Sequence, residues 1–275
     1  MVLNFIHIGK CGGTSLGNAL SYQRSVSNNM TDYKAAIEES NKIATTAIEE
    51  SRASGNPNLS SHVSMVQHIP VMYYHCNTPD YVSTDKYVIC LRNPVDRFVS
   101  AFNWIHLRVT STYNANIGRN HMRYIENNIS EYEFSLYDND VNIFAESLYD
   151  CDGNLNSEVD HIIRRVGKHR NYPSQLGLDI DFYLRDLIWC CKPENIEGII
   201  SFPTIRQDAH RIFGIEIDHH KKSFGNTKLS SKGYANLVKY LKKDYECIEK
   251  LYEMGAMTVE QYSDLKKSNS YDSLK

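Results

Sequence analysis

The sequence predicts an α/β fold in three layers, with a mainly parallel central sheet flanked by helices, and three observations support this prediction. Two short apolar segments, residues 2–8 and 87–91, are each followed by a loop and then by a helical pattern. Near the other end of the chain, residues 196–202 and 204–213 repeat the order of strand and helix. Such alternation is typical of a parallel sheet covered on both faces.

The N-terminal elements are predicted from their composition. Residues 2–8 (VLNFIHI) are β-branched and apolar and lead at once into glycines, which is typical of a short buried strand. Thr14 or Ser15 is expected to cap the helix that follows. A further amphipathic helix is predicted over residues 32–53, where AIEES occurs twice, eleven residues apart.

The strand at residues 87–91 runs into Arg92-Asn93-Pro94, and the proline suits the first turn of a helix that continues to about Arg108. Residues 110–160 are rich in Asn, Tyr, Ser and Asp with weak periodicity. We expect surface loops and short helices there, facing the substrate.

The C-terminal half is predicted to be mainly helical. Helices are expected over residues 179–191 and from Ser231 to Met254, and Thr258 with Gln261 fits a capping box for a last short helix. We expect a single domain over residues 1–265. Residues 266–275, rich in Ser, Asn and Lys, are expected to be a flexible tail.

Composition places the chain among ordinary globular proteins, with 41% hydrophobic and 23% charged residues. Its net charge of −3 provides no global attraction to nucleic acid or to an anionic membrane. The seven cysteines include no Cys-x-x-Cys pair, so reduced thiols are expected. Gly9 and Lys10 interrupt the first apolar run before a signal peptide or membrane span is complete. If Met1 is the native start, we expect a cytoplasmic protein.

The segment IHIGKCGGTSL (residues 6–16) combines a strand, a glycine-containing loop and the start of a helix. This order gathers backbone N–H groups at a helix N-terminus, where phosphate binds well. Gly12 and Gly13 allow close approach, Thr14 and Ser15 offer hydroxyl donors, and Lys10 adds a positive charge. An ATPase-type loop needs its lysine after the last glycine, whereas Lys10 precedes both. The plain alternative is a glycine turn before a capped helix.

The segment VICLRNPVDRFVSAF (residues 88–102) adds a second set of phosphate donors. Arg92 follows a strand at its carboxyl end, where open α/β sheets bind ligands. Ser100 lies eight residues later, two helical turns on, and so returns to the side on which the helix starts. Arg97 is better explained as a solvated or salt-bridged arginine of the helix.

Together these two segments resemble the sulfotransferases that use 3′-phosphoadenosine 5′-phosphosulfate (PAPS). The resemblance is closest to carbohydrate sulfotransferases of the heparan sulfate 2-O- and chondroitin types. IHIGKCGGTSL resembles their 5′-phosphosulfate loop, and LRNPVDRFVSAF resembles their 3′-phosphate segment. Residues 195–215 and 219–252 are similar, more weakly, to the family's late strand, loop and helices.

The resemblance implies a P-loop-like fold that binds PAPS as donor and releases 3′-phosphoadenosine 5′-phosphate (PAP) without a metal. The residues that it assigns to the nucleotide are Lys10, Cys11, Gly12, Gly13, Thr14, Ser15, Arg92 and Ser100. The family usually has proline before the loop lysine and threonine or serine after it, where this chain has Gly9 and Cys11. Because a thiol is a weak donor, the site is expected to depend more on Thr14, Ser15 and backbone amides.

Sulfuryl transfer needs an in-line nucleophile and stabilisation of the leaving phosphate. The resemblance assigns Lys10 to the leaving oxygens and favours His62, in NLSSHVSM, as the general base. His68 is the second candidate. His7 is more simply a core residue of the first strand, and His219 with His220 could line the nucleotide loop or be exposed.

Two other functions are compatible with parts of the sequence. A P-loop kinase would need a lysine after the glycines and a carboxylate for Mg²⁺, and neither is evident. A non-catalytic nucleotide- or glycan-binding protein would have less reason to retain Lys10. The adjacent pairs Cys190-Cys191 and His219-His220 lack the spacing of a zinc site. The expected partner is a hydroxyl-bearing acceptor, a glycan or small molecule, with no nucleic acid or membrane.

Overall fold

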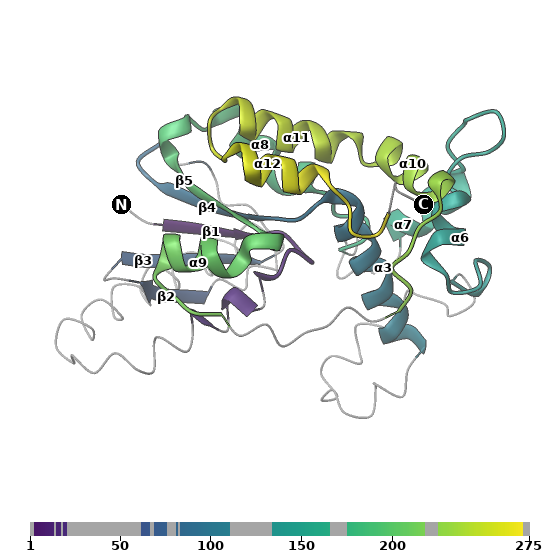
Figure 1. The fold of residues 1–275 in the computed structure, drawn as a ribbon, viewed down its shortest axis with the longest axis horizontal. Helices are drawn as coiled ribbons and strands as arrows, with labels where there is room; N and C mark the ends of the chain where they lie inside the picture. The colour runs from purple at the N-terminus through teal and green to yellow at the C-terminus, as the bar shows by residue number, and fades with distance from the viewer. Residues whose placement is uncertain are drawn as a thin grey trace, which may run out of the picture. The chain divides into compact units, whose positions relative to one another are not determined.

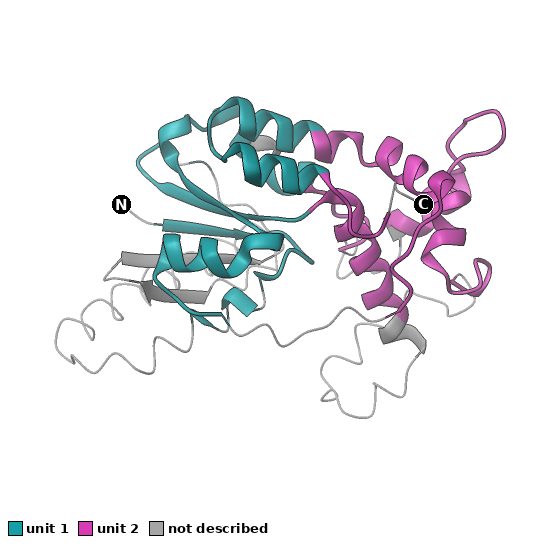
Figure 2. Ribbon diagram, in the orientation of Figure 1, with its two compact units in different colours: residues 1–92, 181–220, 246–266 teal, residues 93–180, 221–245, 267–275 magenta. Residues whose placement is uncertain are grey.

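The structure is a computed structural model, and it describes residues 3–13, 15–17, 19–20, 62–66, 69–75, 81, 83–110, 134–165, 175–217 and 225–271. The chain divides into two compact units, each assembled from three separate stretches (Figure 2). The first unit comprises residues 1–92, 181–220 and 246–266, and the second comprises residues 93–180, 221–245 and 267–275. That residues 1–265 act as one domain stays a prediction.

A five-stranded sheet with the order β2-β3-β1-β4-β5 forms the centre of the first unit (Figure 1). Its strands are β1 (Leu3–His7), β2 (His62–Val66), β3 (Ile69–His75), β4 (Lys86–Leu91) and β5 (Ile196–Ser201). All neighbouring pairs are parallel except β2 with β3, which is antiparallel. Strand β1 is buried along its length, as expected for a strand inside a sheet covered on both faces. The predicted α/β fold with a mainly parallel sheet is confirmed.

Helices α8 (Ile180–Cys190), α9 (Ile205–Phe213) and α12 (Val259–Lys266) belong to the first unit, α8 from its second residue on. Both α9 and α12 contact β5. Helix α9 ends at Gly214, whose φ of 65° is in the left-handed region that glycine tolerates. The predicted capping box of α12 is also present. Thr258 N donates to Gln261 Oε1 over 3.1 Å, and Gln261 N donates to Thr258 Oγ1 over 3.2 Å.

The second unit contains α3 (Pro94–Thr110), α6 (Val141–Glu146), α7 (Ser157–Arg165) and α10 (Ser231–Tyr240) around its own apolar core. Phe134 and Phe144 are completely buried in this core. The prediction of short helices in this region is confirmed. From Phe134 onward the region lies on the surface only in part, because residues 150–155 are exposed whereas Phe134 and Phe144 are buried. A helix of six residues such as α6 makes fewer than two turns, so its periodicity is too short to reveal a buried face.

The single long helix predicted from Ser231 to Met254 is two helices, because the chain turns at Leu241 between α10 and α11 (Lys242–Glu253). Leu241 has φ −91° and ψ 22°, and its side chain is buried. Close to the turn, the buried carboxylate of Asp244 accepts a hydrogen bond of 2.8 Å from Ile180 N. A buried contact of this kind is not visible in helical periodicity, which runs through the turn without a break.

Residues 268–271, which we call the C-terminal strap, lie within the segment that the sequence predicted to be flexible. The strap supplies four hydrogen bonds to the buried carboxylate of Asp96 in α3, from Ser268 Oγ (2.6 Å), Asn269 N (2.9 Å), Asn269 Nδ2 (3.2 Å) and Ser270 N (3.0 Å). Tyr271 stacks on Tyr234 of α10 with ring centroids 4.3 Å apart. A buried carboxylate needs such donors, which gives the strap a fixed position.

Residues 32–53, predicted to be a helix, lie outside the described residues. In the part of the chain that the structure describes, no helix is both long and apolar enough to cross a membrane.

Candidate functional site

The carboxyl ends of β1 and β4 lie side by side in the sheet. His7 is in register with Cys90, so the loop after β1 and the residue Arg92 after β4 leave the sheet at the same edge. The carboxyl edge of a parallel sheet is where α/β folds bind their ligands. The loop after β1 and the first part of the second predicted phosphate segment, up to Arg92, therefore meet at this edge.

The loop after β1 bends sharply at two residues in the left-handed region, Lys10 with φ 70° and Gly12 with φ 88°. Cys11 N donates to Ile8 O over 3.2 Å and closes the first turn. The helix then starts at Gly13, because Gly12 O accepts from Ser15 N at 3.0 Å and from Leu16 N at 3.4 Å. Gly12 is thus the N-cap, and the predicted cap at Thr14 or Ser15 lies two or three residues too late.

Both glycines of the loop are in close contact with side chains. A Cβ atom on Gly13 would lie 1.9 Å from His7 Cδ2, and one on Gly12 would lie 2.6 Å from Ile205 Cδ1. Any larger residue would have to displace these groups. His7 is 3% exposed, which agrees with its prediction as a core residue. Its ring lies directly against Gly13.

Arg92 contacts the loop directly. Its Nη1 donates to Lys10 O over 3.4 Å, and its guanidinium lies 4.3 Å from the centre of the Phe202 ring. An arginine over an aromatic face is held by cation–π attraction and keeps its planar donors in one orientation. The arginine and the lysine of the two motifs are therefore neighbours, and both are half-buried.

Cys11, which was predicted to bind the nucleotide, has a completely buried side chain. Its carbonyl accepts a hydrogen bond of 2.7 Å from Cys90 Sγ, so the residue ties the loop to β4. Burial raises the pKa of the Cys90 thiol well above its ordinary value, and the nearby Cys11 and Asp208 raise it further. Cys11 and Cys90 therefore pack the loop against β4, and the Cys90 thiol keeps its proton near neutral pH.

His62, the predicted base, is the first residue of β2, and its position follows from the strand register. It pairs with Tyr73 of β3, which is in register with Phe5 of β1. Because β2 runs antiparallel to β3, its first residue lies toward the edge of the sheet from which the loop after β1 leaves. Two strand spacings separate His62 from β1, about 10 Å.

The other predicted residues have different locations. Ser100 lies on α3 in the second unit and is half-buried. Arg97 on the same helix is completely buried, and its Nη1 donates to Gln175 O over 3.0 Å, so the interpretation as a solvated arginine is wrong. Thr14, His68, His219 and His220 lie outside the described residues.

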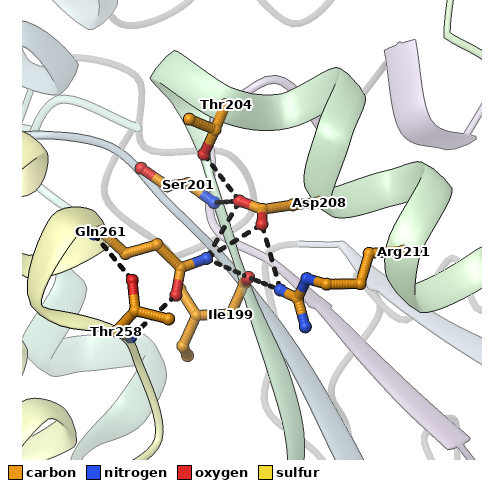
Figure 3. Close-up of polar contacts among 7 residues, drawn as sticks. All are labelled: Ile199, Ser201, Thr204, Asp208, Arg211, Thr258 and Gln261. Carbon is orange, nitrogen blue, oxygen red and sulfur yellow. Dashed lines mark hydrogen bonds and ion pairs between the residues drawn. The ribbon is translucent and has the colours of Figure 1, made fainter.

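The sequence motifs did not identify Phe202, Ile205 or Asp208, which support the loop from the turn between β5 and α9. Asp208 is buried and accepts from Ser201 N over 2.9 Å, and Figure 3 shows the side chains around its carboxylate. Phe202 and Ile205 are ordinary apolar residues near the start of a helix. Only the fold shows that they lie against Gly12.

The residues of the loop fit a phosphate group. Gly12 and Gly13 have no side chains of their own at the turn, the helix that starts at Gly13 presents the positive end of its dipole, and Lys10 and Arg92 supply two positive charges. Among the described residues there is no group of three or more His, Cys, Asp and Glu side chains that could hold a metal ion. Activity without a metal stays a prediction.

Comparison with protein families finds one match of wide extent. The model of the group described as the sulfotransferase family matches residues 1–254 of this chain. The matched region includes both predicted phosphate segments and all five strands. Searches among curated proteins and among solved structures found no significant match.

Proposed function

Because the chain belongs to the sulfotransferase family, we propose that it transfers the sulfuryl group of PAPS to a hydroxyl group of a carbohydrate. The observation that carries the proposal is the contact between Arg92 and the loop at Lys10, which joins the two segments that resemble the donor site. The resemblance of both segments to carbohydrate sulfotransferases supports a sugar acceptor, and a small molecule with a hydroxyl is the other possibility.

The donor would be held mainly by backbone and by positive side chains. Gly12, Gly13 and Ser15 surround the start of a helix, where N–H groups bind the 5′-phosphosulfate. Thr14 is assigned to the same group by the sequence. Arg92 and Ser100 are assigned to the 3′-phosphate by resemblance, and bidentate binding by arginine suits a phosphate dianion.

The chemistry that PAPS supplies is an activated sulfuryl group: its bond to the phosphate oxygen breaks while a bond from sulfur to the acceptor oxygen forms. Lys10 would stabilise the negative charge that grows on the phosphate oxygen as it leaves with the bonding electrons. The left-handed backbone at Lys10 supports this role, since a residue held in a sparsely populated conformation is common at functional sites.

His62 would accept the proton of the acceptor hydroxyl. Its place at the loop edge of the sheet supports the assignment, and a neutral imidazole has a pKa suited to proton transfer near neutral pH. No residue of the chain forms a covalent bond with the sulfuryl group in this mechanism.

Transfer of labelled sulfate from PAPS to a panel of glycan and small-molecule hydroxyls tests the proposal. We expect product with the wild-type protein, and a loss of at least about 100-fold in rate for His62→Ala, as for a missing general base. PAP affinity should be nearly unchanged in this variant. His161→Ala is the matched control, because His161 is an exposed residue of α7 in the second unit. Full activity of His62→Ala would remove His62 from the mechanism.

A further inference from the structure

The carboxylate of Asp208 joins β5, α9 and α12 in one hydrogen-bonded network (Figure 3). Besides Ser201 N, its Oδ2 accepts from Thr204 Oγ1 over 2.8 Å. Gln261 Nε2, from α12, lies 3.0 Å from each carboxylate oxygen. Arg211 Nη2 donates to Oδ1 over 3.0 Å. The carboxylate is therefore satisfied from all three elements.

The network fixes the turn between β5 and α9. Asp208, in the first turn of α9, reaches back to the last residue of β5, so residues 202–204 are held between two fixed points. Gln261 Nε2 also donates to Ile199 O over 3.0 Å. Strand β5 is the end strand of the described sheet, so its outer backbone carbonyls have no neighbouring strand there to bond with. The bond from Gln261 satisfies one of these carbonyls and connects α12 to β5.

The same turn forms a wall of the phosphate loop. Phe202 supports the guanidinium of Arg92 at 4.3 Å. Phe202 and Ile205 also border Gly12, where a Cβ atom would lie 3.1 Å and 2.6 Å from them. A shift of this turn would move the aromatic support of Arg92 and open the contact with Gly12.

We propose that Gln261 is a positioning residue for phosphate binding, which it supports through Asp208, the turn at Phe202 and the guanidinium of Arg92. This inference rests on the proposed function, since it assigns Arg92 to the nucleotide. Gln261 lies beyond residues 1–254, the extent of the family match, so α12 adds a support to the donor site from outside the matched region.

The direct test compares PAP binding by wild type and Gln261→Ala, measured by calorimetry well below the unfolding temperature. Loss of the Nε2 donor leaves a buried carboxylate and the Ile199 carbonyl short of one hydrogen bond each, so the turn relaxes. We expect PAP affinity to fall about tenfold, equivalent to about 1.4 kcal/mol. Gln207→Ala is the matched control, because Gln207 is an exposed glutamine of α9, and its PAP affinity should equal that of wild type.

A double-mutant cycle with Phe202→Leu distinguishes a positioning role of Gln261 from a purely structural one. If Gln261 acts through the Phe202 turn, Gln261→Ala should cost little affinity once the aromatic support is gone. Equal losses in both backgrounds would contradict the proposed route. A lower unfolding temperature together with unchanged PAP affinity in Gln261→Ala would overturn the inference.

Thr204→Val keeps the test decisive if Gln261→Ala does not fold. It removes one hydroxyl donor to the same carboxylate and should weaken PAP binding in the same direction. Unchanged binding by this variant would then overturn the inference. A wild-type protein that does not bind PAP would overturn the proposed function itself, whereas equal binding by wild type and variant would overturn only the role of Gln261.

Discussion

At the level of single residues, the contact between Gly13 and His7 explains why the loop needs glycine at that position. Gly13 lies at the start of the helix, and the ring of His7 occupies the place where a side chain would begin. The two residues act as one unit, in which a core histidine of β1 determines how closely the loop returns to the sheet.

Gly13→Ala should therefore destabilise the protein and weaken PAP binding. The added methyl must displace the buried His7 ring, and overpacking of this kind costs about 1–3 kcal/mol in the free energy of unfolding. Urea denaturation measures the loss. His7→Ala combined with Gly13→Ala makes room for the methyl, so the double variant should be more stable than the sum of the two single losses predicts. Strict additivity would contradict a direct clash.

The sequence predicted the residues of the loop itself but not their support. Lys10, Gly12 and Arg92 could be selected as candidates because phosphate binding favours particular residue types at fixed spacing. Phe202 and Asp208 carry no such pattern, since any apolar ring and any buried carboxylate would look alike in sequence. The burial of Cys11 was also not predictable, because it depends on the neighbouring strand that carries Cys90.

At the level of elements, local signals predicted β1, β4, β5, α3, α8, α9 and α12, whereas the division between α10 and α11 was not visible in the sequence. The last strand and its helix were placed to within a residue or two because Gly214 ends α9 by its own conformation. Strands β2 and β3 were not predicted, although they are consecutive in the sequence and pair antiparallel from Val66 with Ile69. The two residues between them, Gln67 and His68, are not a pair that favours a tight hairpin turn, so the sequence carries no local signal for the pairing.

The role of the C-terminal strap could not be predicted from the sequence, and its removal tests that role. Deletion of residues 268–275 would leave the buried carboxylate of Asp96 without four hydrogen bonds. We expect the second unit to lose about 3 kcal/mol of stability, typical of an uncompensated buried charge. Deletion of residues 272–275 alone keeps the strap and should have little effect.

Fluorescence of Trp104, which lies on α3 in the second unit, reports this loss during urea denaturation. Trp189 lies in the first unit, and Trp189→Phe removes its signal. If the two deletions give the same unfolding midpoint for Trp104, the strap does not stabilise α3.

At the level of the whole molecule, buried thiol and phenol side chains determine how stability depends on pH in alkaline solution. Burial raises the pKa of Cys90, Tyr240 and Tyr245 above their ordinary values of 9.0 for cysteine and 10.0 for tyrosine. In the unfolded chain these groups lose their protons at the ordinary values, whereas the folded protein keeps them. The folded state thus binds more protons in alkaline solution, and its stability is present below pH 9 and falls above it.

The measurement is the free energy of unfolding from pH 7 to pH 10.5. We expect a decline that begins near pH 9 and that becomes shallower in Tyr245→Phe, which has no phenolic proton to retain. A stability that is constant or rises over this range would contradict the burial of these groups.

We propose that the edge of the sheet formed by the Lys10 loop and Arg92 binds the nucleotide of a sulfuryl donor. The sharpest test is calorimetric titration with PAP and with ATP, each with and without Mg²⁺. We expect PAP to bind without metal and more tightly than MgATP, and Arg92→Ala to weaken PAP binding by at least about tenfold, as for a lost charge-assisted contact. Preference for MgATP, or no binding of PAP, would contradict this proposal.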